Sequence, residues 1–443
     1  MLDQVKNTPH SQVAEQVLAD FVAVRSFSEQ LCEPLNTEDF NLQAIAETSP
    51  VKWHLAHTSW FFETFIIKKF SSSFAPFNPR YEYLFNSYYN SIGEQFPRPQ
   101  RGLLSRPGVE EVYQYRQFVT MQISDLVNQL SAEGHKQLSQ VLSLIRLGIN
   151  HEQQHQELLL TDLKYNLFQN PLRPAYRETG KTPADGSPVR PIKWIQFDDE
   201  LVSIGTDIED EAIKQDSFAY DNEAPNHKFY RHQFSVANRL TTNGEYLAFI
   251  EEGGYQEPQH WLSDGWDAVR EHQWQAPLYW FKRNGDWFVY TLNGVKPLNL
   301  NEPVAHVSYY EADAFARWSD ARLLTEQEWE SIANDQSVET DIGNFVEDDV
   351  LHPISAKGMD GLQQMFGDVW EWTSSAYSAY PGFKAASGAV GEYNGKFMCN
   401  QYVLRGGSCV TNRNHIRKTY RNFFYPDARW QFSGIRLARD SQL

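Results

Sequence analysis

The chain has 443 residues, of which 41% are hydrophobic and 14% aromatic, so it is long enough for two domains and has apolar residues to fold throughout. Its 57 acidic against 39 basic residues give a net charge of −18, which argues against nucleic acid or an anionic membrane as a partner. With three cysteines, no signal-peptide pattern and no membrane-length apolar run, the sequence predicts a cytoplasmic protein without disulfides.

Helical periodicity dominates the first 170 residues. Apolar residues recur at spacings of three and four in four segments, 13–32, 50–69, 108–130 and 135–168. Pro50 after Ser49, and Pro107 before two glutamates, are typical of helix starts. We therefore predict a bundle of four long helices.

Two segments without this periodicity divide the chain. Residues 70–106 are rich in aromatic residues, Asn, Pro and Arg and are too long for a simple bundle connection, so we expect them to line a functional site. Residues 171–192 concentrate Pro, Gly and charge, which is typical of a linker. We expect a helical domain in residues 1–175, a linker in 176–192 and a second domain in 193–443.

The second half has short strand-like runs, many Gly and Trp residues and a few short helices. Three helix starts carry capping boxes, namely Thr242 to Glu245, Ser308 to Glu311 and Thr325 to Glu328. We therefore predict an α+β chain, with a helical first domain and a second domain that has much irregular structure.

His151 and His155 lie four residues apart in the last predicted helix, so both imidazoles can reach one metal ion from one helical face. Leu144, Leu147 and Leu158 extend this face, and we expect it to point into the bundle. A pair of satisfied core histidines is the alternative. The segment also matches H-E-x-x-H, in which the glutamate of a zinc peptidase is the general base, but the third histidine of the extended motif is absent.

His54 and His57 form a second histidine cluster, in the second predicted helix. Metal sites in helical bundles are assembled from inward side chains of facing helices, so one histidine of this cluster could complete a three-histidine site. Such a site suits divalent iron or zinc and leaves coordination positions open.

Motifs in both halves of the chain carry a resemblance to a known family. The first half contains LAHTSWFFE and HEQQHQE, and the second contains DNEAPNH, HVSYYEADAFARW, GDVWEWTSSAY, LRGGS and FSGIRLAR. In this combination the chain resembles the sulfoxide synthases of the ergothioneine pathway. The resemblance implies a DinB-like four-helix bundle joined to a C-type-lectin-like α+β domain with the fold of the formylglycine-generating enzyme.

The resemblance also implies a cofactor and a reaction. His57, His151 and His155 would bind Fe(II), with His54 as a neighbour of the site. Family members use dioxygen to join hercynine, the trimethylated betaine of histidine, to a thiol as a sulfoxide. The implied partners are therefore small molecules, namely hercynine, a thiol such as cysteine, and O2.

A proton donor is needed for this oxygen chemistry, and tyrosine is suitable. The 70–106 segment offers Tyr88 and Tyr89, and the second domain offers Tyr377 and Tyr380. We expect Tyr89 and Tyr88 to serve, with Tyr377 as the alternative. Ordinary aromatic packing is the other interpretation of each.

Six further residues are implied to bind substrates, and the sixth is Phe424, which follows Phe423. Arg98 and Arg101 would clamp the carboxylate of the thiol, where the alternative is a pair of solvent-facing loop charges. Gln154 would bind the imidazole of hercynine, or else support a ligand histidine. Asn422 and Phe423 would hold the carboxylate and the trimethylammonium group of hercynine.

The chain departs from relatives that use γ-glutamylcysteine, which tend to carry N-W-D-Y-P-x-R-R near the C-terminus. Residues 422–429 read NFFYPDAR, so Phe424 and Ala428 stand where an acidic residue and an arginine are expected. Neither can pair with a γ-glutamyl group, which favours free cysteine as the sulfur donor. The alternatives are the dipeptide, a selenium donor as in related selenoneine synthases, a zinc hydrolase and a non-catalytic binding module.

Overall fold

The computed structural model describes residues 9–178, 189–208, 218–336, 338–357, 360–385 and 389–440. The chain forms two compact units, Met1–Asn166 and Leu167–Leu443, and each is described by itself. Among the described helices, none combines the length and the apolar character needed to cross a membrane.

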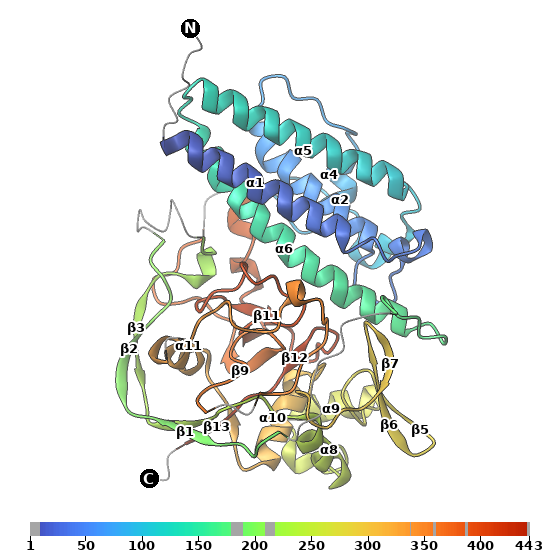
Figure 1. Ribbon diagram of the computed structural model, residues 1–443, viewed down its shortest axis with the longest axis vertical. Coiled ribbons are helices and arrows are strands. Elements are labelled where there is room, and N and C mark those ends of the chain that lie inside the picture. The colour runs from blue at the N-terminus through green and yellow to red at the C-terminus, as the bar shows by residue number, and fades with distance from the viewer. Residues whose placement is uncertain are drawn as a thin grey trace. The chain divides into compact units, whose positions relative to one another are not determined.

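The first unit is helical, which confirms the predicted bundle (Figure 1). Its long helices are α1 (Pro9–Gln30), α2 (Val51–Phe62), α5 (Val109–Ala132) and α6 (Leu138–Phe168). Its shorter segments are η1 (Thr37–Asn41), the π-helical η2 (Glu63–Ile67), α3 (Lys68–Phe70), α4 (Tyr81–Phe85) and η3 (Arg98–Leu103). The predicted second helix is therefore continuous through α2, η2 and α3, and α4 and η3 lie in the 70–106 segment.

The two prolines predicted to mark helix starts lie just before the helices. Pro50 occupies the N-cap of α2 in an extended conformation, and the N-cap of α5 is Gly108, one residue after Pro107. Because the first N–H groups of a helix have no intrahelical partner, a proline immediately before the first turn costs no backbone hydrogen bond.

Every residue of α2 is buried, polar side chains included. Buried polar groups need partners inside the protein. Lys52 Nζ donates to a main-chain carbonyl at 2.6 Å, and Ser59 Oγ accepts a hydrogen bond from Arg25 at 2.9 Å. The other two basic side chains of α2 are His54 and His57, and their partners belong to the candidate site.

Helix α6 approaches α2 closely at Gly148. A Cβ atom at this position would lie 2.3 Å from the ring of Phe62, so the contact requires a residue without a side chain. His151 follows one turn later on α6. The close approach therefore brings His151 within reach of α2.

The second unit is α+β, as predicted (Figure 1), and its described residues form four sheets. The first sheet has the order β1 (Trp194–Phe197), β4 (Phe234–Ala237), β13 (Leu437–Asp440), β8 (Arg322–Leu323). The second has the order β11 (Asn422–Phe424), β10 (Tyr402–Arg405), β9 (Trp370–Ala376), β12 (Ser433–Gly434). The others are β2 (Glu200–Ile204) with β3 (His227–Arg231), and β5 (Trp280–Arg283), β6 (Asp286–Thr291), β7 (Gly294–Pro297).

The strands pair mainly antiparallel. In the second sheet, β10 is antiparallel to both β9 and β11, with Leu404 opposite Trp372 on one side and Asn422 on the other. Strand β12 pairs with β9 in parallel. The register puts β9 and β11 on the two sides of β10. Strand β11 carries Asn422, Phe423 and Phe424, and Tyr377 directly follows the end of β9.

Three helices of the second unit, α8, α10 and α11, begin where the sequence predicts. The described helices of this unit are α8 (Asn243–Glu251), α9 (Ser263–His272), α10 (Tyr309–Trp318) and α11 (Glu326–Asp335), with one-turn segments η4 (Asp221–Glu223), η5 (Pro258–His260), η6 (Val346–Asp348), η7 (Ala389–Glu392) and η8 (Gly395–Phe397). The hydroxyls of Thr242, Ser308 and Thr325 each accept a hydrogen bond from the N–H of the glutamate three residues on, and the carboxylate of that glutamate accepts one from the N–H of the capping residue. All three predicted capping boxes are confirmed.

Candidate metal centre

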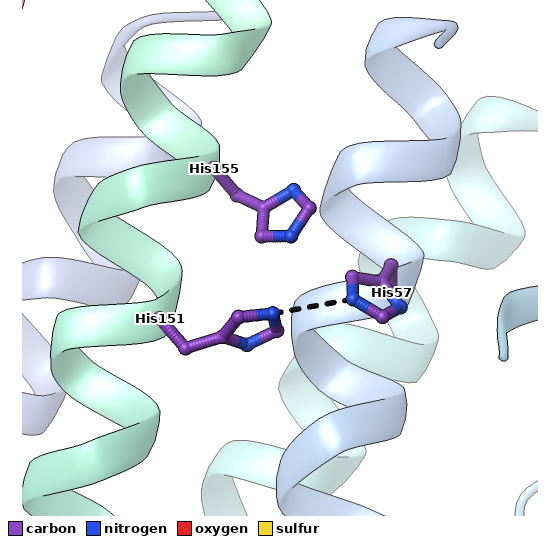
Figure 2. Close-up of side chains that lie close together, drawn as sticks. All are labelled: His57, His151 and His155. Atoms are coloured by element: carbon purple, nitrogen blue, oxygen red, sulfur yellow. Dashed lines mark hydrogen bonds between the residues drawn. The ribbon is translucent and has the colours of Figure 1, made fainter. Parts of the chain in front are cut away.

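Three histidines converge inside the first unit (Figure 2). His57 projects from α2, and His151 and His155 project from α6 toward it. One ring nitrogen of each lies within 4.8 Å of the other two, and His57 Nε2 is 3.2 Å from His151 Nε2. The spacing-based prediction that one histidine of α2 meets the pair on α6 thus agrees with the geometry.

The hydrogen bond on the far side of His57 determines which nitrogen faces the cluster. His57 Nδ1 lies 2.6 Å from the main-chain carbonyl oxygen of Phe85 in α4. A carbonyl oxygen can only accept, so Nδ1 carries the hydrogen and a neutral ring has its lone pair on Nε2. That lone pair points at His151.

Aromatic rings hold these imidazoles in place. Trp53 stacks on His57 with ring centroids 4.5 Å apart, and Trp60 stacks on it with centroids 5.4 Å apart. Phe61 packs against His151 at 4.5 Å. Because Trp53, His57 and Trp60 are spaced by four and three residues, they share one face of α2. This packing restricts ring rotation and keeps water from most of the cluster.

Burial keeps the cluster uncharged. It lowers the pKa of His57 and His155 well below the usual range and that of His151 to about 3, and repulsion among the neighbouring histidines adds to the effect at His57 and His155. Neutral imidazole is the form that binds metal ions. A cation about 2.1 Å from each of two imidazole nitrogens places those nitrogens roughly 3.0 to 3.4 Å apart. The donors present therefore fit one divalent metal ion.

Glu152 lies between the two α6 histidines in sequence but belongs to a different site. Its carboxylate accepts hydrogen bonds from Arg25 at 3.1 Å, Arg116 at 2.8 Å and Ser28 at 2.7 Å. Burial alone would raise its pKa, but these two guanidinium groups and the hydrogen bonds outweigh burial and lower the pKa to about 2. A carboxylate held in this way cannot act as the general base that the H-E-x-x-H reading requires.

The leucines predicted to extend the histidine face into the bundle do not lie in the core. Leu144, Leu147 and Leu158 are half-buried, as is His155, whereas His151, Ile145 and Glu152 are fully buried. The histidines of this face do point into the bundle, toward His57 of α2, and only the leucines are less buried than expected.

Arg101 lies close to this cluster, stacked over the Trp53 ring with its guanidinium carbon 3.4 Å from the centroid. It is buried and donates to Ser49 Oγ at 2.9 Å, but it makes no ion pair with any described residue, and its Nε has no hydrogen-bond partner. Burial and the nearby charge of Arg98 lower the pKa of Arg101. Arg98 is exposed and donates to the carbonyl of Glu47.

Tyr89 and Tyr88 follow α4 and stack on each other with ring centroids 4.6 Å apart. Tyr89 is fully buried and packs against Trp60 at 5.6 Å and Phe65 at 5.1 Å, while Tyr88 is half-buried. Since Trp60 also stacks on His57, a single indole ring separates Tyr89 from a histidine of the cluster. Gln154 is half-buried beside His155 on α6.

The predicted residues of the second unit gather around β9 and β11. The ring of Tyr377 stacks on Phe423 with centroids 4.1 Å apart, and its hydroxyl accepts a hydrogen bond from Asn222 at 2.9 Å. Burial raises the pKa of Tyr377. Asn422 is half-buried and its side-chain oxygen accepts from the Phe423 N–H. Phe424, also half-buried, lies 6.1 Å from Trp430, ring to ring.

Asp162 is a buried residue of this region that the sequence analysis did not single out. Its carboxylate lies 3.1 Å from His54 Nε2, and His54 Nδ1 in turn lies 2.8 Å from His155 Nδ1. A usable signal was present, because Asp162 follows His155 by seven residues, two helical turns along the same face.

Comparison with known proteins supports one family. Residues 20–159 match the DinB superfamily, and residues 202–441 match the sulfatase-modifying factor enzyme 1-like domain. The chain is 32% identical over 312 residues to hercynine oxygenase of Mycobacterium tuberculosis, covering 66% of this chain and 70% of that protein. It is 28% identical over 417 residues to hercynine oxygenase of Mycolicibacterium thermoresistibile, covering 88% and 87%. Ergothioneine biosynthesis protein 1 of Schizosaccharomyces pombe is 28% identical over 233 residues, covering 50% of this chain and 28% of that protein.

These matches and the fold define a two-domain enzyme of the oxygenase class, in which a DinB-superfamily helical region precedes a sulfatase-modifying-factor region. The chain belongs to the hercynine oxygenase family. The resemblance seen in the sequence motifs is thereby confirmed.

Proposed function

We propose that the chain is an iron(II)- and dioxygen-dependent sulfoxide synthase that joins the sulfur of cysteine to C2 of the hercynine imidazole, giving hercynylcysteine sulfoxide. The observation that carries this proposal is the three-histidine cluster of His57, His151 and His155 in a member of the hercynine oxygenase family. Iron bound there supplies the one-electron chemistry by which dioxygen reacts with a thiol and an imidazole.

The overall reaction balances without a further reductant. One carbon–hydrogen and one sulfur–hydrogen bond break, and a carbon–sulfur bond forms. One oxygen atom of O2 becomes the sulfoxide oxygen and the other leaves as water. The protein therefore has to hold two substrates beside the metal and to control when protons arrive.

Arg101 is suited to hold the carboxylate of the thiol substrate. The Arg101 guanidinium is buried and is in ion-pair contact with no described residue, although the Asp162 carboxylate attracts it, so the carboxylate of a substrate would offset its charge. Stacking on Trp53, which itself stacks on His57, fixes this cation next to the candidate metal ligands. Arg98 would add a second, exposed positive charge at the entrance to the same region.

Tyr89 and Tyr88 are suited to deliver a proton, and Gln154 to bind the hercynine imidazole from its place beside His155. Packing of Tyr89 against Trp60 and Phe65 leaves its ring little freedom, so a proton from it would be delivered from a fixed position. Asn422 and Phe423 would hold hercynine's carboxylate and trimethylammonium groups. Tyr377 is the alternative proton donor.

Free cysteine is the favoured sulfur donor because uncharged residues stand at the two positions where relatives that use γ-glutamylcysteine carry charges. Phe424 carries no charge and Ala428 is buried. Arg429, the arginine that does match the dipeptide-using pattern, is already bound to Glu311 at 2.8 Å and to the carbonyl of Ala276. The region around Phe424 is therefore expected to accept a smaller, less charged donor.

The test is aerobic incubation of the full chain, loaded with Fe(II), with hercynine and cysteine, followed by mass spectrometry. With ¹⁸O2 we expect a conjugate that carries one ¹⁸O atom. Parallel reactions replace cysteine with γ-glutamylcysteine or selenocysteine, exclude oxygen, or use zinc in place of iron. Product formed with zinc under anaerobic conditions, or no conjugate with any donor, would overturn the proposal.

A further inference from the structure

A buried chain of hydrogen bonds leads away from His155. His155 Nδ1 lies 2.8 Å from His54 Nδ1, and His54 Nε2 lies 3.1 Å from a carboxylate oxygen of Asp162. That oxygen also accepts the Ser49 N–H at 2.8 Å. His54 and Asp162 are almost completely buried, so the contacts are not averaged by exchange with bulk water.

The direction of each hydrogen bond follows from the chemistry of its end. An ionised carboxylate only accepts, so the hydrogen between His54 and Asp162 belongs to His54 Nε2. A neutral His54 then has its lone pair on Nδ1, and the hydrogen in the next bond must come from His155 Nδ1. His155 is left with its lone pair on Nε2.

Two different devices thus orient two of the candidate ligands. On α2, the Phe85 carbonyl takes the Nδ1 hydrogen of His57 directly. For His155, on α6, the acceptor is His54 Nδ1, and His54 Nε2 in turn donates a hydrogen bond to the Asp162 carboxylate. Both leave the Nε2 lone pair available, but only the second ends on a negative charge, which makes the ligand more electron-rich.

His54 itself is excluded as a ligand by the same contacts. Its Nδ1 is engaged by His155 and its Nε2 by Asp162, so neither nitrogen is left for a metal ion. A purely structural role would need only a polar contact to satisfy His54. The chain from the Asp162 carboxylate through the His54 ring to the His155 ring does more, because it selects one tautomer of His155.

We infer that Asp162 and His54 are positioning residues that act through His155: they hold it in the Nδ1–H tautomer with Nε2 toward the metal. This inference rests on the proposed metal-binding function of His57, His151 and His155. It assigns to the Asp162–His54 pair a part in metal affinity and in the electronic structure of the bound ion, although neither residue contacts the ion.

The first experiment titrates Co(II) alone, as a spectroscopic probe, into the full chain and into Asp162→Asn and His54→Phe. Both variants keep all three ligands, and we expect their affinity for Co(II) to fall by roughly 10- to 100-fold with altered d–d bands. The matched control is Asn166→Ala, one turn further along α6, which removes the buried bonds of Asn166 to Ala44, Thr48 and Leu42 without touching His54. This control should lose stability but keep wild-type affinity and spectrum.

The second experiment needs no variant. The full chain is labelled with ¹⁵N-histidine and loaded with Zn(II) as a diamagnetic probe, and NMR then reports which nitrogen of His155 carries hydrogen. We expect hydrogen on Nδ1 of His155 and on Nε2 of His54. Hydrogen on His155 Nε2, or wild-type Co(II) binding by both variants, would overturn this inference but not the proposed function. Failure of the wild-type chain to bind either metal would overturn the proposed function and this inference together.

Discussion

His57 Nε2 and His151 Nε2 lie 3.2 Å apart although 94 residues separate them in the chain. With the His57 lone pair directed at His151, two such nitrogens at this distance are held together best by a shared hydrogen or a shared cation. The first prediction follows from that pair. His57→Ala and, separately, His151→Ala should lower bound iron per chain at least tenfold and abolish conjugate formation, because two imidazoles remain.

Iron content by elemental analysis and product by mass spectrometry measure both effects. The control is His232→Ala, which removes an exposed histidine of the second unit and should leave both unchanged. Full iron content and activity in His151→Ala would show that the cluster is not the metal site.

Glu152 is predicted to stabilise the bundle and to take no part in the chemistry. Glu152→Gln leaves Arg25 and Arg116 buried with one negative charge fewer, so the free energy of unfolding should fall by about 3 to 5 kcal/mol. Glu29→Gln is the matched control, since Glu29 also pairs with Arg116 but is partly exposed, and should cost about 1 kcal/mol or less. Urea unfolding measures both. Normal stability together with loss of turnover in Glu152→Gln would show instead that Glu152 takes part in the chemistry.

The tyrosine pair is predicted to control how the reaction divides between carbon–sulfur bond formation and simple oxidation of cysteine. Replacing Tyr89 or Tyr88 by Phe removes the proton and keeps most of the ring packing. One of the two variants should make more cysteine sulfinic acid and less conjugate per O2 consumed, with unchanged iron content. If only Tyr377→Phe changes this ratio, the donor lies in the second unit.

Cysteine is predicted to be used in preference to γ-glutamylcysteine, by roughly tenfold or more in kcat/KM. The reason is that Phe424 and Ala428 provide no charges and Arg429 is occupied by Glu311. In the double variant Phe424→Asp, Ala428→Arg, the ratio of the two kcat/KM values should move toward the dipeptide. A wild-type preference for the dipeptide would place its pocket elsewhere.

Asp368 is predicted to make stability depend on pH. Burial raises its pKa to about 6, against an ordinary value of 3.8, despite hydrogen bonds from Asn344, Ile354 and Gln364. The folded state therefore holds this proton more tightly than the unfolded chain. The resulting stability is present below about pH 4 and is lost as the pH rises through about 6, a change of about 3 kcal/mol.

Asp368→Asn removes that titration, so its stability relative to wild type should rise between pH 4 and pH 7. Urea unfolding at several pH values measures the difference, and Asp267→Asn, at an exposed position on α9, should follow the wild-type curve. Parallel curves for wild type and Asp368→Asn would contradict the prediction.

Much of this protein is determined by local sequence. The four long helices follow from apolar spacing, and the capping boxes at Thr242, Ser308 and Thr325 mark helix starts, because both depend on residues within a turn or two of one another. The same holds for His151 and His155, whose common face needs only the helical repeat.

Only the tertiary structure decided which groups meet across the bundle. Nothing in the helical repeat states that Arg25 and Arg116 would neutralise Glu152, that the Phe85 carbonyl would orient His57, or that His54 would link His155 to Asp162. These contacts join residues tens of positions apart, and they depend on how α1, α2 and α5 pack against α6. Packing also decided that Glu152 lies in the interior, because a buried carboxylate is stable there only with the guanidinium groups of Arg25 and Arg116 beside it.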